Sequence, residues 1–254
     1  MLLAIDIGNS HIAIGLNTEE LWVEHWRIST DPRRTADEYT SQLYSMMVQK
    51  HIDPQRIDGV VISSVVPELI TIFKQVSESL CDLKPFLIHR DIESGLIKES
   101  IPAELGADLL SNAAAAHELY PDKTCMVIDF GTALTFTTVD AKGSLLGVAI
   151  APGIGSAVGA LSNKTAQLPH VEISIPKSVL GLNTVEAIQS GVMFGYIGLI
   201  TEMIARTEKE LDRSIHIIAT GGFSKVLSPS IDTIDEIRPW HTLDGLNLLY
   251  QMNS

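Results

Sequence analysis

Cysteine is scarce in this chain of 254 residues, which carries only Cys81 and Cys125. Two cysteines so far apart in the sequence argue against a disulfide framework. Cys125 lies in the apolar run 124–128, so we predict a thiol buried in a strand rather than a reactive one. The eight histidines are scattered, and no Cys/His group has the spacing of a zinc site.

Basic residues are also in the minority, with 18 Lys and Arg against 31 Asp and Glu and a formal net charge of -13. This balance argues against nucleic acid or an anionic membrane as the main partner, although one site can still attract an anionic small molecule. We find no apolar run long enough to span a membrane. The N-terminus has no basic region and reaches Asp6 almost at once, unlike a signal peptide. We therefore expect a cytoplasmic protein with no nucleic-acid and no membrane partner.

What the chain does contain is a duplicated element. Residues 2–10 and 126–133 both read as an apolar strand followed by Asp, an apolar residue, Gly, a polar residue and a small residue. Two further β-rich runs follow each copy, at 11–16 and 21–28 and at 134–139 and 144–150. The duplication predicts two related lobes. The length suits one large domain or two modest ones, and with the duplication we set two lobes at residues 1–115 and 116–254.

Helical patterns alternate with the strands. We predict helices over residues 35–50, 67–80, 105–119, 184–211 and 241–252, and further short strands over 57–62 and 215–219. The helix at 105–119 would join the lobes. The helix at 184–211 contains Gly191, Gly195 and Gly198, around which we expect a break. The interleaving predicts an α/β fold of two lobes, each a mixed sheet flanked by helices.

The repeated turn has the chemistry of phosphate binding. Gly8 and Gly131 allow backbone N–H groups close to phosphate oxygens because glycine has no Cβ. The carboxylates of Asp6 and Asp129 can hold a cation, and Mg²⁺ is usually held through water. One such turn is as often an ordinary hairpin, but two matching turns would place two carboxylates face to face across a cleft. Glycine-rich strand exits at 152–155 and 220–222 are either ligand contacts or ordinary turns.

Short motifs along almost the whole chain resemble those of the type III pantothenate kinases. The matching segments are DIGNS at 6–10, WRIST at 26–30, RTADEY at 34–39, ISSVVP at 62–67, GAD at 106–108, DFGTA at 129–133, APG at 151–153, TVEAIQSG at 184–191 and TGG at 220–222. The resemblance implies an actin-like fold of two ribonuclease H-like lobes and ATP-dependent phosphorylation of the primary hydroxyl of pantothenate, the first step of coenzyme A biosynthesis. It also implies a homodimer, Mg²⁺ or another divalent cation, and K⁺ or NH₄⁺.

The same resemblance implies roles for individual residues. Asp108 would be the general base that accepts the hydroxyl proton, although an acid near the start of a helix is also a dipole partner. Asp129 would hold the monovalent cation, and Asp6 the divalent cation through water. ATP would be bound by Asp6, Ile7, Gly8, Asn9, Ser10, His11, Ile12, Ala13, Thr132, Gly221 and Gly222, and the acceptor by Gly106, Ala107, Asp108, Leu109 and Thr184.

Leu109 and Leu182 depart from the family pattern on the acceptor side, because both stand where the family has arginine. The first of those arginines is expected to pair with the carboxylate of pantothenate, a charged hydrogen bond that contributes about 1.5–3 kcal/mol. Residues 99–102 also differ from the family's Tyr-Asp-Asn-Pro. A different acceptor, a catalytically diverged regulatory homologue and a phosphohydrolase of the same fold all stay open. So does a replacement cation, for which the candidates are Lys98, Lys164, Lys177 and His170.

Overall fold

The computed structural model describes residues 1–18, 21–164 and 171–254. They form two compact units: unit 1 comprises residues 1–115 together with 242–254, and unit 2 comprises residues 116–241. The predicted lobes share the boundary after residue 115. They differ at the C-terminus, where the last segment packs with the first unit rather than the second.

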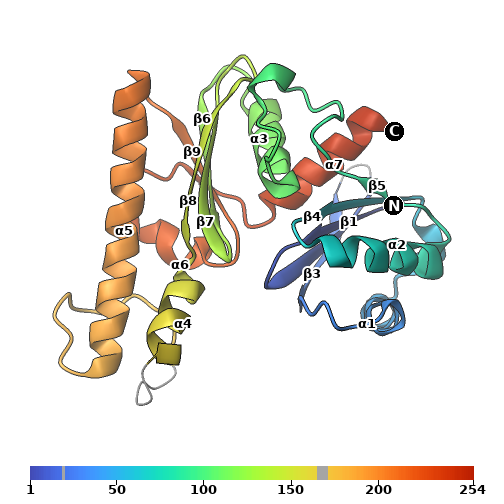
Figure 1. The fold of residues 1–254 in the computed structure, drawn as a ribbon, viewed down its shortest axis with the longest axis horizontal. Coiled ribbons are helices and arrows are strands. Elements are labelled where there is room, and N and C mark those ends of the chain that lie inside the picture. The colour runs from blue at the N-terminus through green and yellow to red at the C-terminus, as the bar shows by residue number, and fades with distance from the viewer. Residues whose placement is uncertain (19–20, 165–170) are drawn as a thin grey trace. The chain divides into compact units, whose positions relative to one another are not determined.

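Unit 1, which contains β1, β3, β4 and β5 of Figure 1, is built on a five-stranded mixed sheet. Its strand order is β3-β2-β1-β4-β5. The strands are β1 (Leu2–Ile7), β2 (His11–Asn17), β3 (Trp22–Ser29), β4 (Gly59–Ser64) and β5 (Phe86–Leu87). β1 pairs antiparallel with β2 and parallel with β4. The carboxyl ends of β1 and β4 therefore meet at one edge of the sheet, where Asp6 is paired with Ser63 and Ile7 with Ser64.

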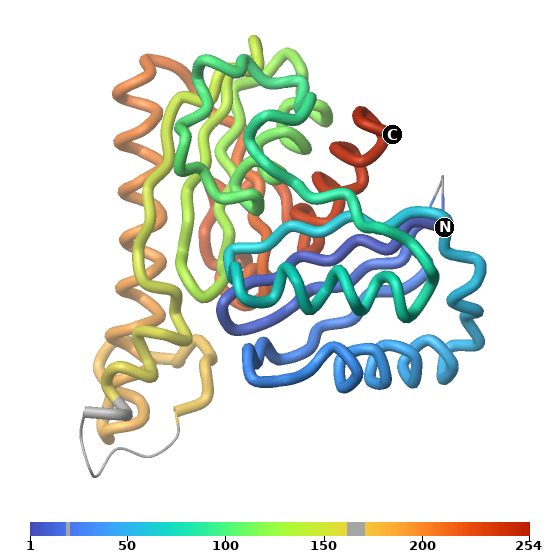
Figure 2. The backbone as a smooth tube through the Cα atoms, turned by 45° about the vertical axis from the view of Figure 1, so that its right-hand side comes forward, coloured from blue at the N-terminus to red at the C-terminus, as the bar shows by residue number. Residues whose placement is uncertain are grey.

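One face of this sheet is covered by α1 (Ala36–Gln49) and α2 (Pro67–Cys81), which run along it side by side in Figure 2. Every second residue of β1, namely Leu3, Ile5 and Ile7, is fully buried in the core with Leu43 of α1 and Phe73 of α2. Because successive side chains of a strand point to opposite faces, the other residues of β1 point to the face away from α1 and α2. Asp6 therefore lies on the opposite face from this core.

Both helices begin at signals that the sequence provides. Thr35 and Glu38 form a capping box at the start of α1, in which each side chain accepts the backbone N–H of the other residue. Pro67 occupies the first turn of α2, where a missing N–H costs nothing. The short 3₁₀ helices of unit 1 are η1 (Pro54–Arg56) and η2 (Lys98–Ser100).

The C-terminal helix α7 (His241–Asn253) packs on unit 1. Trp22 of β3 donates its indole N–H to Asp244 Oδ1 at 2.8 Å. A Cβ on Gly59 of β4 would lie 2.4 Å from the hydroxyl oxygen of Tyr250, so glycine leaves room for this side chain of α7 against the sheet. α3 (Ala107–Leu119) runs from unit 1 into unit 2, as the predicted joining helix should.

Unit 2 repeats the strand plan, with the order β10-β9-β6-β7-β8. Its strands are β6 (Cys125–Phe130), β7 (Ala133–Val139), β8 (Leu145–Pro152), β9 (His216–Thr220) and β10 (Glu236–Ile237). β6 pairs antiparallel with β7 and parallel with β9, as β1 does with β2 and β4. Cys125 is buried and free, and burial raises the pKa of its thiol to about 11. The predicted α/β plan of two mixed sheets flanked by helices is confirmed.

The helices of unit 2 are α4 (Ile154–Lys164), α5 (Thr184–Leu211) and α6 (Ser224–Leu227), with the 3₁₀ helix η3 (Ser228–Ser230). The expected break in α5 is wrong, because the helix continues through all three glycines. A Cβ on Gly191, Gly195 or Gly198 would meet nothing within 4 Å. These glycines face away from the core, and packing of the other face outweighs the roughly 1 kcal/mol that each costs a helix.

α5 is also long and apolar enough, by length and composition alone, to cross a membrane. Its window of highest hydropathy has a mean of 1.3, and 28% of that window is buried. This corrects the expectation that no stretch would meet such a criterion. Val192, Met193, Ile200 and Ile204 of α5 lie in the core of unit 2, and a core helix passes the same test.

Candidate active site

The turn between β1 and β2 is the first predicted phosphate turn. Gly8 donates its N–H to His11 O at 3.0 Å, which closes the hairpin. A Cβ on Gly8 would lie 3.0 Å from the same carbonyl oxygen, so glycine keeps the turn tight. Thr30 holds the turn from outside: its hydroxyl donates to Gly8 O at 2.6 Å and its N–H to Ser10 O at 3.1 Å. Asn9, at the tip, is exposed.

A row of side chains crosses the sheet beside this turn. Asp6 is paired with Ala13 of β2 and Ser63 of β4, and Ala13 is paired with Arg27 of β3. Paired residues on neighbouring strands point to the same face, so Asp6 and Arg27 share a face with only the small Ala13 between them. The motifs alone left Arg27 without a role. The period-2 alternation of residues 22–29 is the signal that places it here.

His11, the first residue of β2, lies near this basic group. Partial burial and then the positive charge of Arg27 lower the pKa of its imidazole below the ordinary value. The lowered pKa favours the neutral imidazole, which can donate or accept a hydrogen bond. Arg27 supplies the positive charge at this position.

Asp108 stands in the first turn of α3, in the same unit. Its Oδ1 accepts the N–H of Leu109 at 2.9 Å. Burial raises the pKa of its carboxyl, against the lowering effect of that hydrogen bond. A Cβ on Gly106 would lie 2.5 Å from Asp108 Oδ1 and 3.7 Å from a methyl carbon of Val65. Val65 donates its N–H to Ile7 O at 3.1 Å, so the loop after β4 is bonded to the end of β1, directly before the first phosphate turn, and its Val65 side chain lies close to Gly106.

Three strand ends of unit 2 meet around Asp129. Gly221, which follows β9, has φ +87°, and a Cβ on it would lie 2.3 Å from Asp129 Oδ1. A Cβ on Gly153, which follows β8, would lie 2.3 Å from Gly131 O and 2.4 Å from Thr132 O. Both glycine-rich exits singled out in the sequence therefore pack against the second phosphate turn, and only glycine allows this approach.

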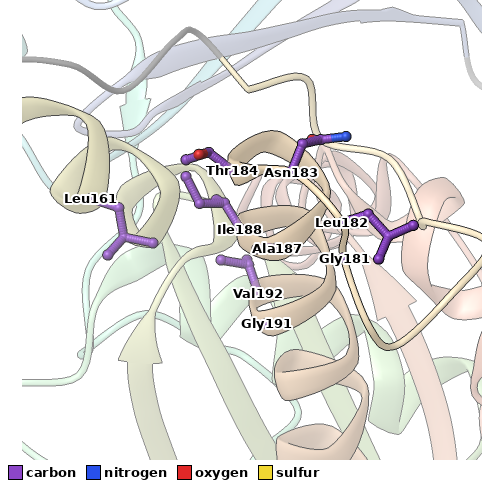
Figure 3. A pocket seen from close by; sticks show the side chains of 9 residues that line it. All are labelled: Leu161, Gly181, Leu182, Asn183, Thr184, Ala187, Ile188, Gly191 and Val192. Carbon is purple, nitrogen blue, oxygen red and sulfur yellow. The ribbon is translucent and has the colours of Figure 1, made fainter.

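Thr184, the predicted acceptor residue of unit 2, lines a pocket of about 680 Å³ at the start of α5 (Figure 3). Asn183 caps α5 by accepting the N–H of Glu186 at 3.0 Å. The pocket is lined by Leu161, Gly181, Leu182, Asn183, Thr184, Ala187, Ile188, Gly191 and Val192. The other predicted acceptor residues, 106–109, belong to unit 1. Their joint action with Thr184 stays a prediction, as does the meeting of the two phosphate turns.

The two leucines at arginine positions have opposite environments. Leu109 is 7% exposed and Leu182 is 94% exposed. Leu109 therefore serves packing, while Leu182 stands in an exposed apolar segment with Val179 and Leu180, which are 65% and 79% exposed.

Four residues were proposed to replace the missing arginines, and the structure describes the side chains of two of them. Lys98 pairs with Asp91 at 3.1 Å, and Lys177 is exposed. The side chain of Lys164 and the whole of His170 lie outside the described residues. Within the described part of the chain, Arg27 is the cation that shares a sheet face with Asp6.

The few carboxylates near the phosphate turns suit a cation that is bound mainly by the phosphates of a nucleotide. Among the described residues, no group of three or more His, Cys, Asp or Glu is arranged to hold a metal ion. Mg²⁺ at phosphoryl-transfer sites is usually bound by one or two carboxylates together with phosphate oxygens and waters. A single carboxylate such as that of Asp6 fits this need. Asp129, packed against the backbone of Gly221, offers a carboxylate in a comparable setting.

Sequence comparison identifies the family. The sequence model described as Type III pantothenate kinase matches residues 2–206. The chain belongs to the type III pantothenate kinase family. One relative so named, from Dehalococcoides mccartyi (strain ATCC BAA-2266 / KCTC 15142 / 195), is 41% identical over 253 residues, which cover 99% of this chain and 98% of the relative. Another, from Roseiflexus sp. (strain RS-1), is 41% identical over 254 residues, 100% of this chain and 99% of the relative.

Solved structures share the fold of this type III pantothenate kinase. The activator of the 2-hydroxyisocaproyl-CoA dehydratase from Clostridium difficile, solved with bound ADPNP, matches with a TM-score of 0.53 and 13% identity over 98% of this chain and 93% of that chain. A likeness at this identity shows the fold alone. Together with the repeated strand order, it confirms the expected actin-like fold. The roles of individual site residues remain predictions.

Proposed function

We propose that this chain transfers the γ-phosphoryl group of ATP to the primary hydroxyl of pantothenate, the first step of coenzyme A biosynthesis. Its family relationship extends over the whole chain and supports this reaction. The structural observation that carries the proposal is the loop at Val65, which is hydrogen-bonded to the end of β1 beside the β1–β2 turn and lies close to Gly106, two residues before Asp108. Phosphoryl transfer to a hydroxyl needs a phosphate cradle and a carboxylate near each other.

In this proposal the β1–β2 turn, residues 6–13, offers backbone N–H groups and the hydroxyl of Ser10 to the phosphates of ATP. Arg27 adds positive charge on the same sheet face. From unit 2, Thr132, Gly221 and Gly222 contact ATP. Support comes from the shared plan of the two units, in which each turn lies at the end of the first strand of a sheet.

Cations complete the proposed phosphate site. Asp6 holds Mg²⁺ or another divalent cation through water, and Asp129 holds K⁺ or NH₄⁺. When bound, the divalent cation neutralises charge on the phosphate oxygens. Omission of each cation in turn from an activity assay tests both assignments, and Asp129→Asn should remove the dependence on K⁺.

Asp108 is the proposed general base. Its raised pKa, caused by burial, makes its carboxylate a better proton acceptor than an exposed aspartate. It accepts the proton of the attacking hydroxyl, while Gly106, Ala107, Leu109 and Thr184 contact the acceptor. Because the side chain of Leu109 is apolar, its contact with pantothenate is apolar and contributes no charge to the carboxylate.

We also propose a cytoplasmic homodimer in which the protomers meet along α5. The face of α5 that carries Gly191, Gly195 and Gly198 is exposed and has nothing within 4 Å of the missing Cβ positions. Small residues spaced in this way let two helices approach closely. A second copy of this chain, with the same open face, is the occupant that fits.

The direct test is an assay of the purified protein with ATP, Mg²⁺, K⁺ and pantothenate, followed for phosphopantothenate. Formation of the product at a rate set by both substrates supports the proposal. Loss of ATP that does not depend on pantothenate would indicate a phosphohydrolase. Binding of ATP without turnover would indicate a regulatory homologue, and either result overturns the kinase assignment.

A further inference from the structure

The segment that follows β3 makes a contact for which the motifs assign no role. Thr30, the first residue after β3, donates its hydroxyl to Gly8 O at 2.6 Å and its N–H to Ser10 O at 3.1 Å. Gly8 and Ser10 both belong to the β1–β2 turn. One residue that is distant in the sequence therefore fixes two carbonyl groups of a short turn.

This contact determines where the amides of the turn point. In a planar trans peptide, the C=O and the following N–H point in opposite directions. When Gly8 O accepts from Thr30, the N–H of Asn9 must point away from Thr30. The bond to Ser10 O likewise directs the N–H of His11 away from Thr30, toward Gly8 across the hairpin. Thr30 thus sets the direction of one potential phosphate donor, the N–H of Asn9, without touching a ligand.

Unit 2 contains a related arrangement, built from different residues, in which both donors bind one carbonyl oxygen. Gly153, the first residue after β8, donates its N–H to Thr132 O at 3.0 Å, and Ser156 donates its hydroxyl to the same oxygen at 2.9 Å. β8 is the third strand of its unit in chain order, as β3 is in unit 1. Two segments without a common motif therefore supply an N–H and a hydroxyl to equivalent turns. A repeated device of this kind indicates a shared purpose rather than a chance contact.

We propose that Thr30 is a positioning residue for ATP, whose hydroxyl orients the N–H of Asn9 toward the phosphates, and that Ser156 holds the second turn in place through its bond to Thr132 O. The proposal rests on the proposed function, in which residues 6–13 and Thr132 bind ATP. Preorganised backbone donors stabilise phosphate charge because no reorientation is needed when the ligand arrives. If Thr30 had only a structural role, its loss would lower the stability of the protein but would not affect the binding of ATP more than that of pantothenate.

The test compares Thr30→Val with Thr30→Ser. Valine has the shape of threonine but no hydroxyl, while the backbone N–H bond to Ser10 remains available. Thr40→Val is the matched control, because the hydroxyl of Thr40 is buried and has no hydrogen-bond partner among the described residues. ATP affinity is measured by calorimetry, KM is measured separately for ATP and pantothenate, and thermal unfolding is recorded for each variant.

For Thr30→Val we expect kcat/KM for ATP and the ATP affinity to fall by roughly fivefold to tenfold, the value of one hydrogen bond of about average strength. KM for pantothenate should change little, and Thr30→Ser should restore ATP affinity. Unchanged ATP affinity in Thr30→Val, or equal losses for both substrates, would overturn the positioning role. A wild-type protein that neither binds ATP nor phosphorylates pantothenate would instead overturn the proposed function. Should Thr30→Val fail to fold, Ser156→Ala at its exposed site must show the same selective loss of ATP affinity.

Discussion

Asp108→Asn removes the proposed general base and leaves its local hydrogen bond in place. Oδ1 of Asp108 accepts the N–H of Leu109 at 2.9 Å, and an amide oxygen can accept the same bond. Because the two side chains are also nearly equal in size, α3 should begin as before. We expect kcat to fall by roughly 10²–10⁴-fold, the usual contribution of a positioned acid or base, while KM for ATP changes little.

The pH dependence of this substitution has a definite sign. Burial raises the pKa of the Asp108 carboxyl in the folded protein, so the folded state holds this proton more tightly than the unfolded state does. The resulting stability is present below the unfolded pKa, about 3.9, and is lost as the pH rises through the raised folded pKa. Asparagine never carries the charge. The melting temperature of Asp108→Asn relative to wild type should therefore increase as the pH rises across this window.

Two measurements test this prediction. One is phosphopantothenate formation as a function of pH, in which the wild-type rate should fall on the acid side as Asp108 is protonated. The other is thermal unfolding of both proteins from acid to neutral pH. Asp53→Asn is the control, because Asp53 is exposed and accepts the N–H of Gln55 at 3.0 Å at the start of a short helix. More than about a tenth of wild-type kcat in Asp108→Asn would refute the base assignment.

Three other substitutions follow from the geometry. Gly221→Ala should lower the free energy of unfolding by about 1–3 kcal/mol and weaken ATP binding, because φ is +87° and the new Cβ would lie 2.3 Å from Asp129 Oδ1; an unchanged melting temperature would contradict this. Leu109→Arg should lower KM for pantothenate by roughly tenfold or more, whereas an unchanged KM would show that another group already holds the carboxylate. Gly195→Leu should convert the proposed dimer to a monomer in light scattering, while Gly147→Leu, also at an open position, should not; a dimer that survives Gly195→Leu would rule out α5 as the interface.

Much of the fold follows from local pattern. The helix predicted at 184–211 has those bounds, because its apolar residues recur at helical spacing and Asn183 provides a cap. α4 was not predicted, since Gly153, Gly155 and Gly159 make residues 152–159 look like a loop. β5 and β10 have two residues each, too few for a period to show. The expected break in α5 failed because packing, rather than glycine content, decides whether a long helix continues.

The candidate site divides in a similar way. Asp6 and Asp129 could be proposed from the sequence because the end of a strand, a turn and an acidic residue coincide at each position, whereas Asp108 was proposed from the family resemblance. Thr30 could not be proposed, since its hydrogen bonds reach a turn 22 residues earlier in the chain. The packing of α7 on unit 1 was equally hidden, because an apolar helix face does not specify which sheet it will cover.

Because α7 returns to unit 1, unit 2 is an insertion within its partner rather than a tail after it. The chain leaves and re-enters unit 1 at neighbouring points, where Thr242 donates its hydroxyl to Asn112 Oδ1 at 2.9 Å. A short linker could therefore bridge residues 115 and 242 and leave the host sheet with all its strands. Truncation before residue 242 would instead remove α7 from unit 1 and expose part of the unit that carries Asp6. The lost residues are the furthest from Asp6 in the sequence.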